Sequence, residues 1–253
     1  MSNIAFCLLT RVPSVEWIQF LTEIAKYTKF NVMIICDDNT YVADKDLPLR
    51  VIQYDNKILQ EAGYRNACYV TITKDITAWD KAIYHLCEVE TDYDYAYLIE
   101  DDVFIPSIRS IVSIQEKYVD EDLICHCDNG FFEKDNGNIY VWHWRHAYNR
   151  LELPWYASMV CAIRVSNKLL KEMKQHIRII KEIPFIEIAW NTIAHQKNLK
   201  VRIIPEFKYI VYNPISLNYK EYKEYLQEGN WLHPIKEIKD HDRIREELNI
   251  KNV

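Results

Sequence analysis

Residues 94–106 read DYAYLIEDDVFIP, a run of apolar and aromatic residues that is interrupted by three consecutive acids. Residues 95–99 have the composition of a buried strand, whereas Glu100, Asp101 and Asp102 repel one another and are poor strand formers. A core strand that carries three carboxylates to its C-terminal end is expected to meet a cation there. Mg²⁺ or Mn²⁺ would take one or two of these oxygens, which are the ligands that hard cations prefer. A solvated acidic turn after a buried strand is the alternative.

The segments on either side of this strand alternate between strand and helix patterns. Further strands are predicted over residues 4–9, 31–36, 49–54, 122–127, 155–165 and 200–204. Helices are predicted to begin at Ser14, Thr77, Ser107, Ser166 and Phe185. This alternation indicates an α/β fold, in which helices flank a mostly parallel sheet.

The length of the chain fits one such domain. Its 253 residues, 49% of them hydrophobic, are enough to bury one substantial core. No linker or repeat interrupts the pattern. We therefore predict one domain, with the main body over residues 1–217 and a C-terminal appendage over residues 218–253.

Charge and glycine content exclude several classes of protein. The net charge is −6 and no cluster of Lys and Arg occurs, which argues against a nucleic-acid-binding surface. With only four glycines, the chain has neither a P-loop nor a dinucleotide fingerprint. Nucleotidylyltransferases have a glycine-rich loop after the first strand, where this chain has TRVP at residues 10–13. Any diphosphate must therefore be bound by a metal ion and cationic side chains.

The seven cysteines are scattered through apolar patterns and are predicted to be reduced core residues. The N-terminus lacks the basic region of a secretory signal, and no run of eighteen apolar residues is present. These features predict a cytoplasmic protein without a transmembrane segment.

The stretch LIEDDV at residues 98–103 resembles the acidic "DXD" motif of nucleotide-sugar glycosyltransferases with the GT-A fold, in a Glu-Asp-Asp variant. The resemblance implies a Rossmann-like, mixed and mostly parallel sheet, a bound Mn²⁺ or Mg²⁺, and a nucleotide-diphosphate sugar as donor. It also implies that Asp102 ligates the metal, that Glu100 contacts the nucleotide, and that Asp101 contacts the donor sugar or supports the metal ligands.

A second motif, WLHPIK at residues 231–236, resembles the C-terminal segment that closes over the active site in many of these enzymes. The resemblance implies that His233 is another metal ligand and that Lys236 contacts the diphosphate. A neutral imidazole suits Mn²⁺, and a lysine would neutralise charge on the departing nucleoside diphosphate. The alternative is a surface loop held in place by Trp231.

The expected nucleotide contacts lie at the ends of the first two strands. The resemblance places the base and ribose near Thr10 and Arg11 and near Asp37 and Asp38, with Lys81 as a further nucleotide or phosphate contact. An ordinary turn at residues 37–39 and an exposed helix lysine at residue 81 are the alternatives.

Inverting transfer requires a general base, and Glu187 at the start of a late helix matches the family's placement of that group. Its apolar neighbours are expected to raise its pKa into a useful range. A favourable interaction with the helix dipole is the alternative explanation for this acid. Asp128 is the second candidate for the base, and the sequence leaves the stereochemistry open.

The resemblance implies a metal-dependent glycosyltransferase, a hexosyl- or deoxyhexosyltransferase with an inverting mechanism and a UDP-sugar as the favoured donor. Trp142, Trp144 or Trp155 is expected to line a site for a carbohydrate acceptor, because aromatic rings stack on sugar faces. Two alternatives stay open: a relative that binds or hydrolyses a metal-nucleotide sugar without transfer, and a non-enzymatic α/β interaction module. The CHC stretch at residues 125–127 is interpreted as structural, because no second ligand pair lies in range for zinc.

Overall fold

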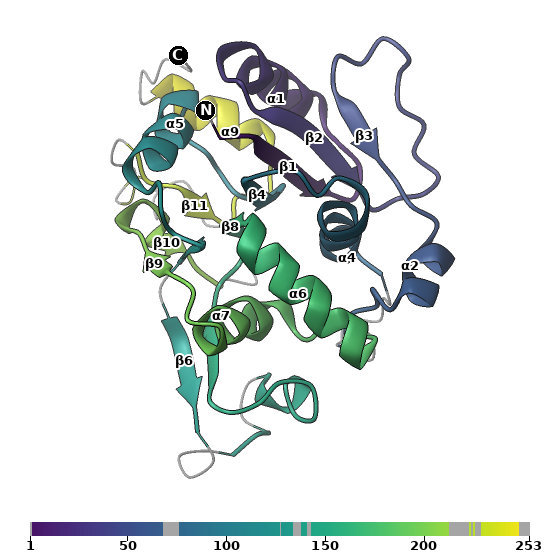
Figure 1. Ribbon diagram of the computed structural model, residues 1–253. Coiled ribbons are helices and arrows are strands. Elements are labelled where there is room, and N and C mark those ends of the chain that lie inside the picture. The colour runs from purple at the N-terminus through teal and green to yellow at the C-terminus, as the bar shows by residue number, and fades with distance from the viewer. Residues whose placement is uncertain are drawn as a thin grey trace.

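A seven-stranded sheet with strand order β3-β2-β1-β4-β8-β5-β9 forms the centre of the protein (Figure 1). The computed structural model describes residues 2–67, 76–126, 128–133, 138–140, 143–212, 223, 225 and 229–247. The strands are β1 (Ile4–Thr10), β2 (Asn31–Cys36), β3 (Arg50–Ile52), β4 (Tyr95–Glu100), β5 (Leu123–Cys125), β8 (Ala162–Ser166) and β9 (Val201–Ile203). Only β8 runs antiparallel to its neighbours in this sheet. The predicted mixed, mostly parallel sheet is confirmed.

Helices cover both faces of the sheet, so that each central strand is buried on two sides. One face carries α1 (Val15–Tyr27) and α5 (Ile108–Lys117), and the other carries α4 (Ala78–Tyr84), α6 (Asn167–Ile180) and α7 (Ile186–Gln196). In β1, Phe6 and Leu8 pack on the first face, whereas Ala5 and Cys7 pack on the second. This two-sided burial explains the continuous apolar runs of these strands.

Serine caps fix three of the predicted helix starts. The hydroxyls of Ser14, Ser107 and Ser166 each accept the backbone N–H three residues later, at 3.2 Å, as expected for N-cap residues. The helix predicted over residues 77–90 changes character partway, because α4 is followed by a π-helical turn (His85–Val89).

The strand predicted over residues 155–165 is two strands in different sheets. β7 (Trp155–Ser158) pairs with β6 (Asp128–Phe132), whereas β8 joins the central sheet. Residues 159–161 connect them. The apolar run is continuous because both strands are buried, so its composition gave no sign of the break.

The C-terminal segment returns to the end of β4. It contains β11 (Leu232–His233), which pairs with β10 (Tyr209–Ile210), and α9 (Lys239–Glu247). α9 is anchored by Arg245, whose guanidinium lies 4.1 Å from the ring centroid of Phe20 and donates to the carbonyl of Ile105. Figure 1 shows α9 beside α1 and α5. The start of the predicted appendage, near residue 218, lies outside the described residues.

The remaining short elements in the described ranges are α2 (Asn56–Ala62) and two 3₁₀ turns, η2 (Trp144–His146) and η3 (Pro205–Phe207). The five cysteines in the described part of the chain are all buried, and none of them forms a disulfide: Cys7, Cys36, Cys87, Cys125 and Cys161. Cys68 and Cys127 lie outside it. No described helix combines the length and apolar character that crossing a bilayer requires.

His241 is expected to make the C-terminal segment sensitive to acid. Its ring lies edge-on to Trp17 and Phe104, and its Nε2–H donates to the carbonyl of Ile235 at 3.1 Å. Burial, followed by the positive charge of Arg245, lowers the pKa of His241 to about 3. An unfolded histidine has a pKa of about 6.5, so between these values the unfolded chain takes up the proton first and stability falls as pH falls.

Through His241, the free energy of unfolding is expected to fall by up to about 1.4 kcal/mol for each pH unit of acidification between pH 6 and pH 4. His241→Gln removes the titrating group, so its stability should depend less steeply on pH in urea unfolding measured across this range. The same change at His195, an exposed residue of α7, serves as the control. Equal slopes for wild type and His241→Gln would contradict the prediction.

Candidate active site

A cavity of about 410 Å³ opens where β1, β2 and β4 end. Thr10, Arg11 and Asp37 line it from β1 and β2, and residues 100–102 line it from β4. Phe185 and Ile186, at the start of α7, also border it. β1 pairs with β2 on one side and β4 on the other, so the chain crosses over in opposite directions from this strand. Ligands of open α/β sheets bind at such switch points.

Backbone hydrogen bonds turn the acidic triplet out of the sheet. The N–H of Glu100, the last residue of β4, donates to the carbonyl of Cys161, the residue before β8, at 2.8 Å. The N–H of Val103 then donates to the carbonyl of Glu100 at 3.1 Å, closing a turn that contains Asp101 and Asp102. The carboxylates therefore project from the end of the strand toward the cavity.

The C-terminal segment is attached to the chain just after this turn. Phe104 and Leu232 exchange two backbone hydrogen bonds, at 2.8 and 3.1 Å, and the N–H of Ile235 donates to the carbonyl of Asp102 at 2.7 Å. His233 lies between these attachments. The two motifs that the sequence marked are therefore neighbours in space.

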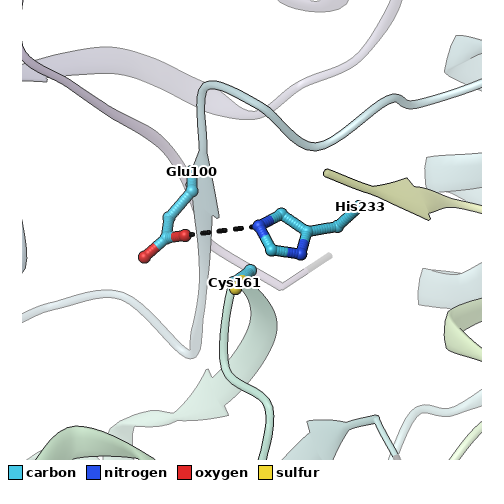
Figure 2. A group of neighbouring side chains, drawn as sticks. All are labelled: Glu100, Cys161 and His233. Atoms are coloured by element: carbon cyan, nitrogen blue, oxygen red, sulfur yellow. Dashed lines mark ion pairs between the residues drawn. The ribbon is translucent and has the colours of Figure 1, made fainter. Parts of the chain in front are cut away.

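The imidazole of His233 faces two of the acids. Its Nδ1 lies 2.8 Å from the carbonyl of Val211, which can only accept, so Nδ1 carries a proton. Its Nε2 lies 3.2 Å from Oδ1 of Asp102 and 3.9 Å from Oε2 of Glu100, the pair marked in Figure 2. Burial alone would lower the pKa of His233, but the hydrogen bond and charge of Asp102 outweigh it and raise the pKa.

The pKa values of Asp102 and Glu100 are shifted in opposite directions at this site. Burial opposes ionisation of Asp102, but the hydrogen bond and charge of His233 outweigh it, so the pKa of Asp102 is lowered. Burial, followed by the charge of Asp102, raises the pKa of Glu100. Two carboxylates therefore compete for the positive charge of one imidazole, which favours a further cation between them.

Trp79 orients Glu100, a role that sequence reasoning missed. A capping box formed by Thr77 and Asp80 starts α4, and Trp79 follows in its first turn. Its Nε1–H donates to Oε1 of Glu100 at 2.6 Å, so that Oε2 is the oxygen nearest His233. An indole at the start of an amphipathic helix is most often a core residue, which is why the pattern gave no signal for this contact.

Thr10 and Asp101 are bonded to each other. The hydroxyl of Thr10 donates to a carboxylate oxygen of Asp101, and the indole N–H of Trp17 donates to the Asp101 carbonyl at 2.8 Å. Burial raises the pKa of Asp101 against the effect of the Thr10 hydrogen bond. Both residues border the cavity, but this pairing makes Asp101 a support of the turn.

Lys81 is fully buried, not the exposed helix lysine that was the alternative expectation. Its Nζ donates to the Asp37 carbonyl and to Oδ1 of Asn39, each at 2.6 Å, and ties α4 to the end of β2. The Asp38 carboxylate accepts from the N–H and hydroxyl of Thr40, which is the ordinary turn that the sequence also allowed. Of these acids, Asp37 borders the cavity.

Glu187 occupies the first turn of α7, beside the two residues that border the cavity. Burial, followed by the charge of Glu100, raises its pKa to about 7, whereas the charge of His233 opposes this shift. The direction is the one expected from its apolar neighbours. The backbone of Asp128, the other candidate base, lies in β6, and its side chain is outside the described residues.

The aromatic residues proposed for an acceptor site have a structural role where they are described. Trp144 and Trp155 are buried and pack with Phe132, with ring centroids 5.6 and 5.0 Å apart. Trp142 lies outside the described residues. Lys236 is exposed, and its charge contributes to the lowered pKa of Asp102.

The donor atoms around His233 fit a divalent cation. Carboxylate oxygens of Glu100 and Asp102 and Nε2 of His233 form an oxygen and nitrogen set of the kind that Mn²⁺ accepts. Cys161 adds a sulfur to this group, because its Sγ, a Glu100 oxygen and a His233 nitrogen lie within 4.8 Å of one another. Sequence reasoning missed Cys161 as well.

No protein-family model matches this sequence, and no curated protein sequence is similar to it. Several solved structures are similar along most of the chain. The galactosyltransferase LgtC, in complex with donor and acceptor sugar analogues, has 9% identity and a TM-score of 0.48 over 96% of this chain and 95% of that chain. Mouse xyloside xylosyltransferase 1 has 9% identity and a TM-score of 0.41 over 92% of this chain and 97% of that chain.

A 4-diphosphocytidyl-2C-methyl-D-erythritol synthase from Anaerococcus prevotii has 8% identity and a TM-score of 0.43 over 98% of this chain and 96% of that chain. Identities this low, with TM-scores below 0.5, assign neither a family nor an activity to the protein.

Proposed function

We propose that this protein is a metal-dependent glycosyltransferase of the GT-A type, which moves a sugar from a nucleotide-diphosphate donor to an acceptor hydroxyl. The observation that carries the proposal is the contact between Asp102 and His233. Two motifs far apart in the sequence meet at 3.2 Å, at the rim of a 410 Å³ cavity. An incidental acidic turn gives no reason for a buried histidine to be fixed against it.

Asp102 and His233 would hold the cation, with Glu100 beside them. His233 donates Nδ1–H to a backbone carbonyl, so Nε2 is the nitrogen that turns toward the acids. It would ligate the ion after releasing its proton to solvent. Mn²⁺ or Mg²⁺ bound here would neutralise charge on the donor diphosphate. Lys236, exposed near Asp102, is proposed to add a second positive charge to the same group.

The donor would extend from this rim into the cavity. Arg11 and Asp37 border the cavity at the ends of β1 and β2, and we place the base and ribose there. An Asp37 oxygen would accept a hydrogen bond from a uracil N–H. Thr10 and Lys81 would support the donor site indirectly. Thr10 hydrogen-bonds Asp101, and Lys81 hydrogen-bonds the backbone at the end of β2. A UDP-sugar is the favoured donor.

Glu187 is the proposed general base of an inverting reaction. It would accept the proton of the acceptor hydroxyl as that oxygen attacks the anomeric carbon from the face opposite the diphosphate. A pKa of about 7 suits this role, because the group is then ionised in part at neutral pH and strong enough to take a proton. Asp128 is the second candidate.

Binding of nucleotide sugars in the presence of Mn²⁺ tests the donor site directly. A ligand at one hundred times its Kd stabilises a protein by about 2.7 kcal/mol, which for a domain of this size raises Tm by roughly 5 to 10 °C. We expect such a shift with UDP-sugars and Mn²⁺, and a much smaller one in EDTA. GDP-sugars serve as the comparison.

The products then separate transfer from hydrolysis. Incubation of the stabilising donor with a panel of carbohydrate acceptors should give a glycosylated acceptor together with the nucleoside diphosphate. Free sugar without a glycosylated acceptor would indicate a hydrolase. No thermal shift with any nucleotide, with or without metal, would instead favour an interaction module.

A further inference from the structure

A buried thiol lies against the proposed metal ligands. Cys161 is 6% exposed and directly precedes β8, and its carbonyl accepts the N–H of Glu100. Because β8 runs antiparallel to β4, this pairing places Cys161 at the end of β4 where the acids leave the sheet. Figure 2 shows its Sγ next to the gap between Glu100 and His233, and the three donor atoms lie within 4.8 Å of one another.

This is the one group of three His, Cys, Asp or Glu donors that lie so close together in the described part of the chain. Other described thiols have different surroundings. Cys87 lies 3.4 Å from the carbonyl of Leu170, and Cys125 lies 3.9 Å from an amide oxygen of Asn191. A position beside Glu100 and His233 therefore distinguishes Cys161 from the other described cysteines.

The chemistry of a thiolate differs from that of the oxygens around it. Carboxylates suit Mg²⁺ and Mn²⁺, whereas thiolate sulfur selects softer ions, among them Zn²⁺. With Asp102, which lies 3.2 Å from His233, the group offers two carboxylates, an imidazole and a thiol. Zn²⁺ accepts carboxylate oxygen, imidazole nitrogen and thiolate sulfur, and three protein ligands are enough for a zinc site that keeps one position open.

We infer that Cys161 is a metal ligand, and that this site binds Zn²⁺ and chemically similar ions through sulfur in addition to the oxygen and nitrogen donors. The inference rests on the proposed function to the extent that His233 is a ligand of both kinds of ion. When Zn²⁺ binds, the S–H bond of Cys161 breaks, the proton passes to solvent, and a sulfur–metal bond forms. No atom changes oxidation state.

Co²⁺ reports sulfur ligation by absorption, because a thiolate ligand gives a charge-transfer band in the near ultraviolet. Titration of the metal-free protein should give this band in the wild type and in Cys87→Ser, which makes the same change at a buried thiol on the π-helical turn. Cys161→Ser should lose it. A band of unchanged intensity in Cys161→Ser would overturn the inference.

Affinity gives a second measure. Competition with a chromogenic chelator should show that Cys161→Ser binds Zn²⁺ at least about 10-fold more weakly, since even the loss of a group that only supports a ligand has effects of this size. Its affinity for Mn²⁺ should stay unchanged. Equal loss for both ions would make the cysteine a packing residue.

X-ray absorption of the zinc-loaded wild type needs no variant. We expect a sulfur scatterer at about 2.3 Å from the metal; nitrogen and oxygen scatterers alone would overturn the inference. Thermal shifts with nucleotide sugar and Mn²⁺ on the same preparation separate the two proposals. A sulfur–zinc signal without nucleotide binding would contradict the proposed function and support the zinc site. Nucleotide binding without a sulfur–zinc signal would support the proposed function and contradict the zinc site.

Discussion

Replacing Glu187 with glutamine is expected to slow sugar transfer by about 10²- to 10⁴-fold while donor binding stays nearly intact. Glutamine keeps the size of the side chain and can donate and accept hydrogen bonds, but it cannot take the proton of the acceptor hydroxyl. Product formation and donor Kd are to be measured on the same preparation. Near-normal transfer would remove Glu187 from the role.

Glu16→Gln is a matched control for this change. Glu16 lies in the first turn of α1, as Glu187 does in α7, so both substitutions remove the same favourable interaction of an acid with a helix N-terminus. Asp128→Asn tests the second candidate. A collapse of transfer in that variant alone would move the base to β6, and a product that retains the donor's anomeric configuration would exclude the inverting mechanism.

The pH dependence of transfer follows from the same group. A general base acts in its ionised form, and burial raises the pKa of Glu187 to about 7. The wild-type rate at saturating donor should therefore rise with pH and level off above about pH 7. In Glu187→Gln the residual rate should lose this rise.

Asp102→Asn is expected to abolish the metal-dependent part of nucleotide binding. Asparagine is similar in shape but lacks the charge that Asp102 contributes beside Nε2 of His233. Affinity for the nucleoside diphosphate in Mn²⁺ should fall by more than the 10- to 100-fold that follows loss of a group supporting a metal ligand. In EDTA the variant and the wild type should differ little. Calorimetry under both conditions makes the comparison.

His233→Ala should behave in the same way, since it removes the other proposed ligand. Asp120→Asn, at an exposed position, controls for the loss of one negative charge. Equal losses of affinity in Mn²⁺ and in EDTA would show that Asp102 and His233 act structurally. Unchanged binding in both conditions would place them outside the site.

The sequence predicted the central strands and helix starts because these are local properties. β1, β2 and β4 are apolar runs of strand length, and serines mark the starts of α1, α5 and α6. β11 was missed because it has two residues and is held by hydrogen bonds to Phe104, more than a hundred residues earlier in the chain. No periodicity can show a contact of that kind.

The candidate site was predictable to the same extent. The acids and His233 were recognisable from short motifs, but the direction in which each side chain points was not. Lys81 has the pattern of an exposed helix residue, yet it is buried because three acceptors at the end of β2 surround its ammonium. Cys161 looks like any apolar strand residue, and only its register against Glu100 brings it to the site.

The attachment of Leu232 to Phe104 has a consequence for the order of events during synthesis. Asp102 leaves the ribosome about 130 residues before His233 does, which at 5 to 20 residues per second is a delay of roughly 7 to 26 s. For that time the acidic turn exists without its histidine or the C-terminal segment that covers it. A nascent chain can therefore fold the first strands of its sheet, but it acquires the complete set of proposed ligands only after residue 233 has been made.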